Sequence, residues 1–298
     1  MFTGVPADHA STGRADPALL AIEASRKLRA GSRFRGLLWL DETASTNDDA
    51  MALARDGAPE GAVVLAEHQT TGRGRRQRRW VAPPGSGLLV SVLLRPPVEL
   101  AGCVGMLAGV AMAEAVEAVA GVAVGLKWPN DLVWADDRGG DDGRPDRKLA
   151  GILCEADWPP GSTASGGWRR PYPGERVAVV AGIGINVTQP DEMPLEVAET
   201  ATSLQQIRGD APDRVDLLVA FLDHLDARYG ELLEDGAGPL QDEWRRRTTT
   251  LGRRVRVLLA GDEVDGIAAD ITPEGHLVVD TTSGDRRTFA VGDVVHLR

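Results

Sequence analysis

Five arginines lie within seven residues of a chain whose formal net charge is −11. They belong to the segment Gln69-Thr-Thr-Gly-Arg-Gly-Arg-Arg-Gln-Arg-Arg-Trp80, in which Gly72 and Gly74 interrupt any helix or strand. Apolar runs at 62–66 and 87–94 flank this segment and predict a strand on each side. We therefore expect a cationic, glycine-hinged loop between two strands. Such a loop is suited to closing over a polyanion, because backbone N–H groups at glycines can approach a ligand closely.

Other interpretations of this loop fit the sequence less well. The Walker A pattern is absent, and a G-x-G-x-x-G pattern fails because Gln77 stands at the third glycine position. A nucleic-acid patch is one alternative, although only Trp80 among the nearby residues could stack on a base. A merely solvated run of charge is another, but it would need neither the flanking strands nor the paired glycines.

Length and composition exclude several classes of protein. With 298 residues the chain has room for one large domain and a small one. Its acidic balance argues against bulk nucleic-acid binding, so we expect no DNA partner. Cys103 and Cys154 form no C-x-x-C pair, which argues against a disulfide framework or a zinc site. We expect a cytoplasmic protein, because the N-terminus lacks a signal-peptide pattern and the apolar run at 100–113 is too short to cross a membrane.

Lysine and asparagine are rare in this chain. It has 30 Arg but only three Lys and three Asn. Where arginine serves as the general cation, lysine is expected to remain where its ammonium group is specifically needed. All the asparagines and two of the lysines fall in five polar segments that also include the arginine loop; they are Asn47, Lys127, Asn130, Lys148 and Asn186. Coincidence is the alternative explanation.

The pattern along the chain predicts three parts. Residues 1–32 read as a disordered tail, 1–16, and a helix, 17–30. Within 33–248 we expect strands at 34–40, 62–66, 87–94, 148–156 and 177–187, and helices ending at Arg55 and spanning 100–120, 213–233 and 240–248. Residues 249–298 carry short alternating runs that indicate a small β-barrel or sandwich. Two polar inserts, 135–147 and 158–176, are expected on the surface.

The remaining polar segments have simple structural interpretations as well as functional ones. Thr46 or Asn47 could cap the helix that ends at Arg55, which leaves other hydroxyl groups for a neutral ligand. Pro129 ends an apolar run and places Asn130 and Asp131 in a turn. In the buried run 177–187, glycines suggest close approach by a ligand or by a neighbouring element.

Five motifs in this order resemble those of the bacterial biotin protein ligases: Thr43-x-Ser-Thr-Asn-x-x-Ala50, Gln69-x-x-Gly-Arg-Gly-Arg-Arg-x-Arg-x-Trp80, Lys127-Trp-Pro-Asn-Asp131, Lys148-Leu-Ala-Gly-Ile-Leu153 and Gly182-Ile-Gly-Ile-Asn186. The resemblance begins near residue 33 and is to the monofunctional class, which lacks an N-terminal DNA-binding domain. It implies an α+β fold. A mixed sheet with helices, similar to class II aminoacyl-tRNA synthetases, would fill 33–248 as the catalytic domain. An SH3-like barrel would follow at 249–298. The family loop usually has glycine where this chain has Gln77.

The resemblance also implies a reaction in two steps. The carboxylate of biotin attacks the α-phosphate of Mg·ATP, which gives biotinyl-5'-AMP and pyrophosphate. A lysine of the biotin carboxyl carrier domain of acetyl-CoA carboxylase, or a related carboxylase, then takes the biotinyl group. Biotin and ATP would be substrates, Mg²⁺ the metal and the carrier protein the partner, with a homodimer left open. Cations suit this chemistry because two anions have to meet.

Residue roles follow from the matching motif positions. Lys148, Arg75 and Asp131 are the implied catalytic residues. Lys148 would bridge the biotin carboxylate and the α-phosphate, and Asp131 would hold Mg²⁺ or orient the acceptor lysine. The implied biotin-binding residues are Ser45, Thr46, Asn47, Gln69, Gly72, Arg73, Gly74, Lys148, Gly182 and Gly184. The implied ATP-binding and adenylate-binding residues are Arg73, Arg75, Arg76, Arg78, Trp80, Lys127, Asn130, Asp131, Lys148 and Asn186.

Two alternatives compete with this function. A lipoate or octanoate ligase on a related scaffold is disfavoured by the polar set Ser45, Thr46 and Gln69, since a lipoyl head group needs no partners for a ureido ring. A regulator that senses biotin without catalysis is disfavoured by Lys148 and the complete arginine loop.

Overall fold

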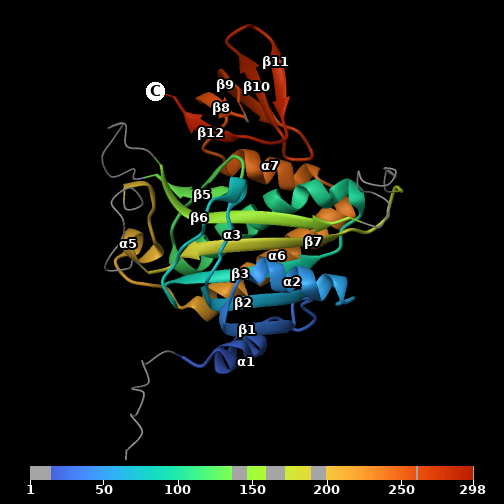
Figure 1. Ribbon diagram of the computed structural model, residues 1–298, viewed down its shortest axis with the longest axis vertical. Coiled ribbons are helices and arrows are strands. Elements are labelled where there is room, and N and C mark those ends of the chain that lie inside the picture. The colour runs from blue at the N-terminus through green and yellow to red at the C-terminus, as the bar shows by residue number, and fades with distance from the viewer. Residues whose placement is uncertain (1–14, 136–145, 159–171, 189–198, 260, 298) are drawn as a thin grey trace, which may run out of the picture.

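The computed structural model describes residues 15–135, 146–158, 172–188, 199–259 and 261–297. Most of the expected tail and most of the two expected inserts lie outside these residues. The first described element is a helix, α1 (Pro17–Lys27), whose N-terminal N–H of Ala18 bonds to the capping carboxylate of Asp16. It packs beside the first strand (Figure 1).

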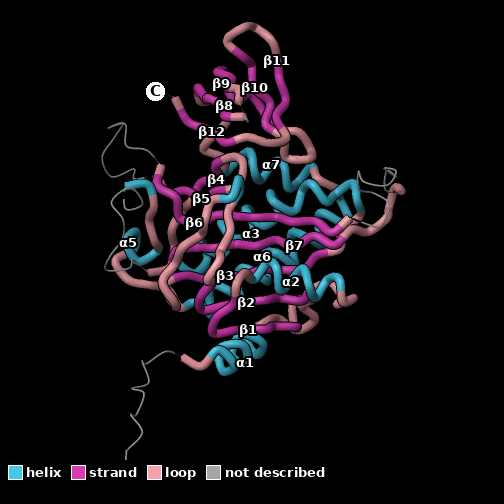
Figure 2. Tube along the Cα trace, in the orientation of Figure 1, coloured by secondary structure: helices cyan, strands magenta, loops and turns pink. Residues whose placement is uncertain are grey.

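The described residues form one large mixed sheet (Figure 2). Its strand order is β1-β2-β3-β7-β6-β5-β4. The pair β1·β2 is parallel and the other neighbours are antiparallel. The bounds are β1 (Gly36–Thr43), β2 (Ala62–Gln69), β3 (Gly87–Leu94), β4 (Gly125–Lys127), β5 (Asp131–Trp134), β6 (Arg147–Asp157) and β7 (Ala178–Asn186). The expected strands are all present, with ends shifted by a few residues.

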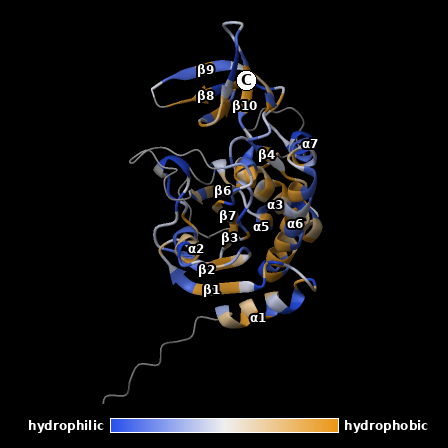
Figure 3. Ribbon diagram, turned by 90° about the vertical axis from the view of Figure 1, so that its right-hand side faces the viewer, coloured by the Kyte–Doolittle hydropathy of each residue, from blue (hydrophilic) through white to orange (hydrophobic). Residues whose placement is uncertain are grey.

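Helices cover both faces of this sheet. On one face lie α3 (Val104–Ala120), α6 (Arg214–Asp235) and α7 (Gly238–Arg247), which enclose the main core (Figure 3). On the other face lies α2 (Thr46–Arg55), packed on a smaller cluster that includes Val64 and Val180. Alternate residues of β2, β3 and β7 point into these two clusters, which explains why these strands are apolar almost throughout.

The most apolar stretch of the chain is the helix at the centre of the main core. The 3₁₀ turn η2 (Val98–Cys103) and α3 together make a run that is apolar and long enough to cross a membrane. Its side chains are mostly buried inside the molecule, with 72% of the most apolar window covered. The small residues of α3 allow this close packing, so the stretch serves as a core helix and indicates no membrane span.

A second, antiparallel sheet follows at the end of the first (Figure 1). Its order is β11-β10-β9-β8-β12, with bounds β8 (Arg254–Leu258), β9 (Glu263–Ile271), β10 (Leu277–Thr281), β11 (Arg286–Phe289) and β12 (Asp293–His296). The five expected runs are confirmed as strands. Among the described pairings none joins β11 to β12, so the closed barrel that the resemblance implied is not found.

One expectation about helices was wrong, and one helix was not expected. Neither Thr46 nor Asn47 caps α2. The cap position is Ser45, which makes no side-chain cap bond, while Thr46 and Asn47 lie inside the helix and bond to other elements. A further short helix, α5 (Leu204–Arg208), was not expected. Its cap is clear in the structure, since the hydroxyl of Ser203 accepts a bond from the N–H of Gln206.

Candidate active site

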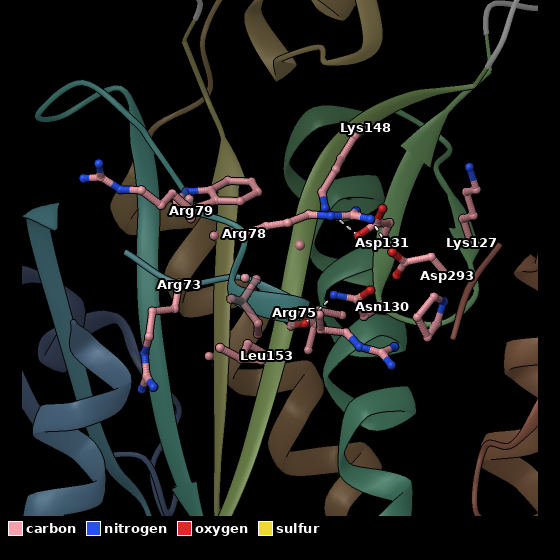
Figure 4. A pocket seen from close by; sticks show the side chains of 18 of the residues that line it. Arg73, Arg75, Arg78, Arg79, Lys127, Asn130, Asp131, Lys148, Leu153 and Asp293 are labelled. Carbon is pink, nitrogen blue, oxygen red and sulfur yellow. Dashed lines mark hydrogen bonds and ion pairs between the residues drawn. The ribbon is translucent and has the colours of Figure 1, made fainter. Parts of the chain in front are cut away.

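A cavity of about 300 Å³ opens on the face of the large sheet that carries α2. It runs from the start of α2, across β7 and β6, to the turn between β4 and β5, with the arginine loop above it (Figure 4). One end of β12 and the end of β8 complete the wall. The predicted site residues that line it are Ser45, Thr46, Asn47, Gln69, Arg73, Gly74, Arg75, Arg78, Trp80, Lys127, Asn130, Asp131, Lys148, Gly182 and Gly184.

Three predicted residues do not line this cavity. Asn186 donates from its amide to the carbonyl of Thr202, 3.0 Å away. Gly72 and Arg76 line a second hollow, formed mostly by the arginine loop itself. A side chain at Gly72 would meet the carbonyl oxygen of Trp80 at 2.5 Å, so this glycine is needed by the loop itself. The ligand contacts predicted for these three residues stay predictions.

Glycines form the floor of the cavity. Gly151 and Gly184 are paired across β6 and β7, and the indole ring of Trp80 lies on both. A Cβ atom at Gly184 would stand 2.5 Å from Trp80 Cε2, and one at Gly182 would stand 1.9 Å from Asn47 Oδ1. The sequence left open whether a ligand or a neighbouring element comes close to Gly182 and Gly184. In the structure the close neighbours are Asn47 at Gly182 and Trp80 at Gly184.

Hydroxyl and amide groups meet at one end of the cavity. Gln69 Oε1 accepts from the backbone N–H of Thr46 at 2.8 Å and lies 3.0 Å from its hydroxyl oxygen. The amide of Asn47 donates to Leu153 O at 3.1 Å and to Glu155 Oε2 at 2.8 Å. Both donors of Asn47 are thus used within the protein, whereas Ser45 and Gln69 keep polar atoms at the cavity wall.

The arginine loop is a small hairpin that spreads its cations apart. Residues Arg73 and Arg79 pair across it, and Trp80 N–H bonds to Gly72 O at 2.9 Å. A 3₁₀ turn, η1 (Arg75–Gln77), forms the tip, with Arg76 in the left-handed region at φ 53°. Figure 4 shows Arg73 and Arg79 pointing outward while Arg78 extends toward Lys148. A left-handed tip residue is favourable for glycine and strained for arginine.

Protein carboxylates hold several of these cations. Arg73 bonds to Asp48 at 2.5 Å and to Glu155 at 2.9 Å. Arg76 and Arg78 both bond to Asp293 at the start of β12, so the second sheet anchors the tip of the loop. Burial lowers the pKa of Arg75 below its ordinary value, because leaving water disfavours the charged guanidinium.

A lysine and a carboxylate face each other at the other end of the cavity. Lys148 Nζ lies 2.6 Å from Asp131 Oδ1 and 5.8 Å from the centre of the Trp80 ring. Asn130 holds the turn against β6, since its side-chain amide donates to Ile152 O at 2.7 Å and its backbone carbonyl accepts from Ile152 N–H. Lys127 stands at the rim (Figure 4). The ammonium group of Lys148, at this end of the cavity, can contact two anions at once.

Several residues in and around the site were not predicted, and four of them bear on its geometry. Ser91 on β3 and Gly151 on β6 sit inside runs that read as plain strand. Glu155 and Asp293 are ordinary acidic residues in an acidic chain, and only the folded structure brings them to the arginine loop. The signal available in the sequence was weak, namely a lone serine in an otherwise apolar strand. Among the described residues no group of three metal-ligating side chains occurs.

Comparisons with known proteins agree with this geometry. The Biotin/lipoate A/B protein ligase family matches residues 40–164, and the Biotin protein ligase C terminal domain matches 250–297. A Mycobacterium tuberculosis protein named biotin--[acetyl-CoA-carboxylase] ligase is 40% identical over 278 residues, which covers 90% of this chain and 92% of the relative. The Bacillus subtilis bifunctional ligase/repressor BirA is 32% identical over 257 residues, 85% and 72% of the two chains.

A solved structure has the same fold. The biotin protein ligase from Aquifex aeolicus in complex with biotin and ATP matches with a TM-score of 0.67 and 26% identity. The match covers 89% of this chain and 100% of that chain. The fold of this chain therefore belongs to a known architecture.

Proposed function

The chain belongs to the biotin protein ligase family, and we propose that its cavity activates biotin with ATP and transfers the biotinyl group to a carboxylase. The first product is biotinyl-5'-AMP, and the acceptor is a lysine of a biotin carboxyl carrier domain. One observation carries this proposal. A single cavity joins a hydroxyl and amide corner at Gln69 to an ammonium group at Lys148 beneath a loop of arginines.

The cations serve the first step. A carboxylate and a triphosphate repel each other, so both need neutralisation before the carboxylate oxygen can reach the α-phosphorus. Lys148 leaves Asp131 and contacts both reacting groups, while Arg75 and Arg78 neutralise the remaining phosphate charge. The P–O bond to pyrophosphate breaks as the bond to the carboxylate forms. The loop then excludes water, which would otherwise hydrolyse the acyl adenylate.

Asp131 serves the second step. The acceptor amine has a reference pKa of about 10.4 and has to lose a proton before it attacks the acyl carbon. Asp131 orients this amine and accepts the proton at its other oxygen, Oδ2, and AMP leaves with the electrons of the broken acyl–oxygen bond. Asp131 also suits Mg²⁺, which binds one or two carboxylates and several substrate phosphates. When bound, that ion supplies further neutralisation of the phosphates.

An edge of β6 that no described strand covers offers a docking place for the acceptor. β5 pairs only with residues 147–151 of β6, so beyond Ile152 the described neighbour is β7 alone. Ile152 N–H points outward to Asn130, and by alternation the backbone groups of Cys154 and Ala156 point the same way. We place the lysine-bearing segment of the carrier there as an added strand. A second copy of this chain would pair at the same edge, which gives a homodimer that excludes the carrier.

Substitutions at this edge separate docking from activation. Ala156→Pro removes an outward N–H and is expected to slow biotin transfer to the carrier at least tenfold, while biotin-dependent ATP–pyrophosphate exchange stays unchanged. Ala156→Ser keeps the N–H and is the matched control. Equal transfer rates for the two variants would place the acceptor elsewhere.

ATP–pyrophosphate exchange tests the function itself. The purified protein is expected to exchange pyrophosphate into ATP only when biotin is present. Exchange with lipoate or octanoate in place of biotin would favour the related ligase, which the shared family model includes. Binding of biotin without exchange would favour a regulator. The net charge of −11 supports the expectation that the chain binds no DNA, and we propose a cytoplasmic location for the reaction.

A further inference from the structure

A buried serine lies behind the hydroxyl and amide corner of the cavity. Ser91 on β3 is 0% exposed, and its hydroxyl oxygen lies 2.6 Å from Asn47 Oδ1 and 2.8 Å from Thr46 Oγ1. It is paired in register with Gly182 of β7, whose missing side chain leaves room for the Asn47 amide. A hydroxyl group enclosed in this way has no access to water, so its partners are fixed by the protein.

The orientation of Asn47 follows from its other contacts. Its amide nitrogen lies within hydrogen-bond distance of a backbone carbonyl, Leu153 O, and of a carboxylate, Glu155 Oε2. Both atoms are acceptors only, so that atom of Asn47 is the NH₂ group and the other is the carbonyl oxygen. Ser91 therefore donates its single hydrogen to Asn47.

The orientation of Gln69 follows in the same way. Its Oε1 accepts from the backbone N–H of Thr46 at 2.8 Å, which identifies this atom as the carbonyl oxygen. The hydroxyl of Thr46, 3.0 Å away, therefore donates its single hydrogen to Gln69 in this arrangement. Both hydroxyl hydrogens are now used, yet the oxygens of Ser91 and Thr46 are also 2.8 Å apart.

The corner is thus one hydrogen short. Three close oxygen–oxygen contacts share two hydroxyl hydrogens, and the Ser91–Thr46 contact is left without one. A ligand N–H that donates to Gln69 Oε1 takes the place of the Thr46 hydrogen there, so the Thr46 hydrogen can turn to Ser91. Each of the three acceptor oxygens, Gln69 Oε1, Ser91 Oγ and Asn47 Oδ1, then receives a hydrogen, and the Thr46–Gln69 contact no longer needs one. A ligand that offers only acceptors or carbon at this place leaves the shortage in place.

We propose that Ser91 is a positioning residue that makes this corner select ligands with an N–H donor. It fixes Asn47, and through it the start of α2, and it presents an acceptor to which Thr46 turns when the ligand arrives. This inference rests on the proposed function, in which the donor is a ureido N–H of biotin. Ser91 itself touches no substrate.

Calorimetric binding of biotin and steady-state kinetics test this role. Ser91→Ala leaves Asn47 Oδ1 unpaired and Thr46 without its second acceptor. We expect the dissociation constant and the KM for biotin to rise about tenfold, while the KM for ATP and kcat change less than twofold. Ser91→Cys, which keeps a weak donor of similar size, is expected to recover part of the affinity.

The matched control is Val92→Ala. Val92 is also 0% exposed on β3 but belongs to the opposite core cluster. It is expected to lower the melting temperature at least as much as Ser91→Ala, with an unchanged KM for biotin. Equal effects of both variants on biotin affinity would reduce Ser91 to a packing residue and overturn the inference. Failure of the unaltered protein to bind biotin would instead overturn the proposed function.

A second ligand tests the donor preference directly. Biotin methylated on its ureido nitrogens lacks the N–H groups. The unaltered protein is expected to favour biotin over this analogue by a larger factor than Ser91→Ala does. The same ratio in both proteins would show that Ser91 has no part in selecting donors.

Discussion

At the scale of single residues, the active site depends on charged side chains that the fold places in the cavity before any substrate binds. The ammonium group of Lys148 is paired with Asp131 at 2.6 Å within the cavity. Lys148→Ala removes the cation that we propose to bridge the two substrates, and we expect biotin-dependent ATP–pyrophosphate exchange to fall by about 100-fold or more. Lys27→Ala, at an exposed lysine of α1 paired with Asp216, is the control and should keep full exchange. Exchange near the normal rate in Lys148→Ala would remove this residue from the chemistry.

The glycine under Trp80 gives a second prediction at this scale. Gly184→Ala places a methyl group 2.5 Å from Trp80 Cε2 and displaces the indole from the cavity floor. We expect the KM for ATP to rise at least tenfold. Gly230→Ala lies in the middle of α6 with nothing within 4 Å of the added atom. That control should raise the free energy of unfolding by about 0.5–1 kcal/mol and leave the kinetics unchanged.

The sequence could identify some of these residues and not others, depending on the chemistry of their side chains. Lys148 and the arginines stand out because a charged group in a motif has few structural uses, and the structure brings most of them to one cavity. Gly182 and Ser91 are different. The sequence could not say whether a glycine makes room for a ligand or for Asn47, and a serine inside an apolar strand gives no sign of the face on which it lies.

At the scale of elements, the arginine loop is tied down at its tip. Asp293 bonds to both Arg76 and Arg78, and Leu258 O accepts a further bond from Arg76 at 3.0 Å. Asp293→Asn weakens these ion pairs, so we expect trypsin to cut residues 72–80 several-fold faster in the free protein. Biotin with ATP should protect the loop in both proteins and reduce the difference.

The control for this loop prediction lies in the same sheet. Asp285→Asn changes an exposed residue in the turn between β10 and β11, away from the loop. Its cleavage rate is expected to match that of the unaltered protein. Loop cleavage that ignores both Asp293→Asn and the substrates would contradict the closing function of the loop.

The sequence predicted the strands on either side of this loop but not how they pair. Apolar runs bounded by glycine or proline identify β2, β3 and β7, because strands buried on both faces read as continuous apolar runs. The parallel pairing of β1 with β2 depends on the path of α2 between them, which periodicity does not reveal. The short helix α5 has only five residues, too few for a periodic pattern.

At the scale of the whole molecule, the second sheet shares the main apolar core with the first, and polar contacts add to this packing. Trp128 Nε1 donates to Gly275 O at 3.0 Å, and Arg245 of α7 forms an ion pair with Asp270 at 2.8 Å. The first link joins residues more than a hundred positions apart, and the second joins a helix to a strand. No local pattern in the sequence predicts either contact. The expected strands of the second sheet were confirmed, while its docking against the site became visible only in the structure.

The ion pair at Asp270 predicts a dependence on acid. Arg245 holds the pKa of Asp270 below its ordinary value of 3.8. Because the pKa is lower in the folded state, the stabilisation is fully present above that ordinary value and is lost as the pH falls through the folded pKa. We expect melting temperatures measured from pH 6 to pH 3 to fall more steeply for the unaltered protein than for Asp270→Asn. Parallel curves would show that this pair contributes nothing to holding the sheets together.

Asp293 has a consequence for how the nucleotide enters. In the free protein this carboxylate already pairs with Arg78, one of the two arginines that we propose for the phosphates, and with the neighbouring Arg76. When ATP binds, its phosphates replace the Asp293 carboxylate as partners of the arginines. The net positive charge that the phosphates meet is therefore smaller than the number of arginines suggests. Salt screens the net electrostatic attraction between the nucleotide and the site. The affinity for ATP should therefore vary weakly with ionic strength, and more steeply once Asp293 is neutralised.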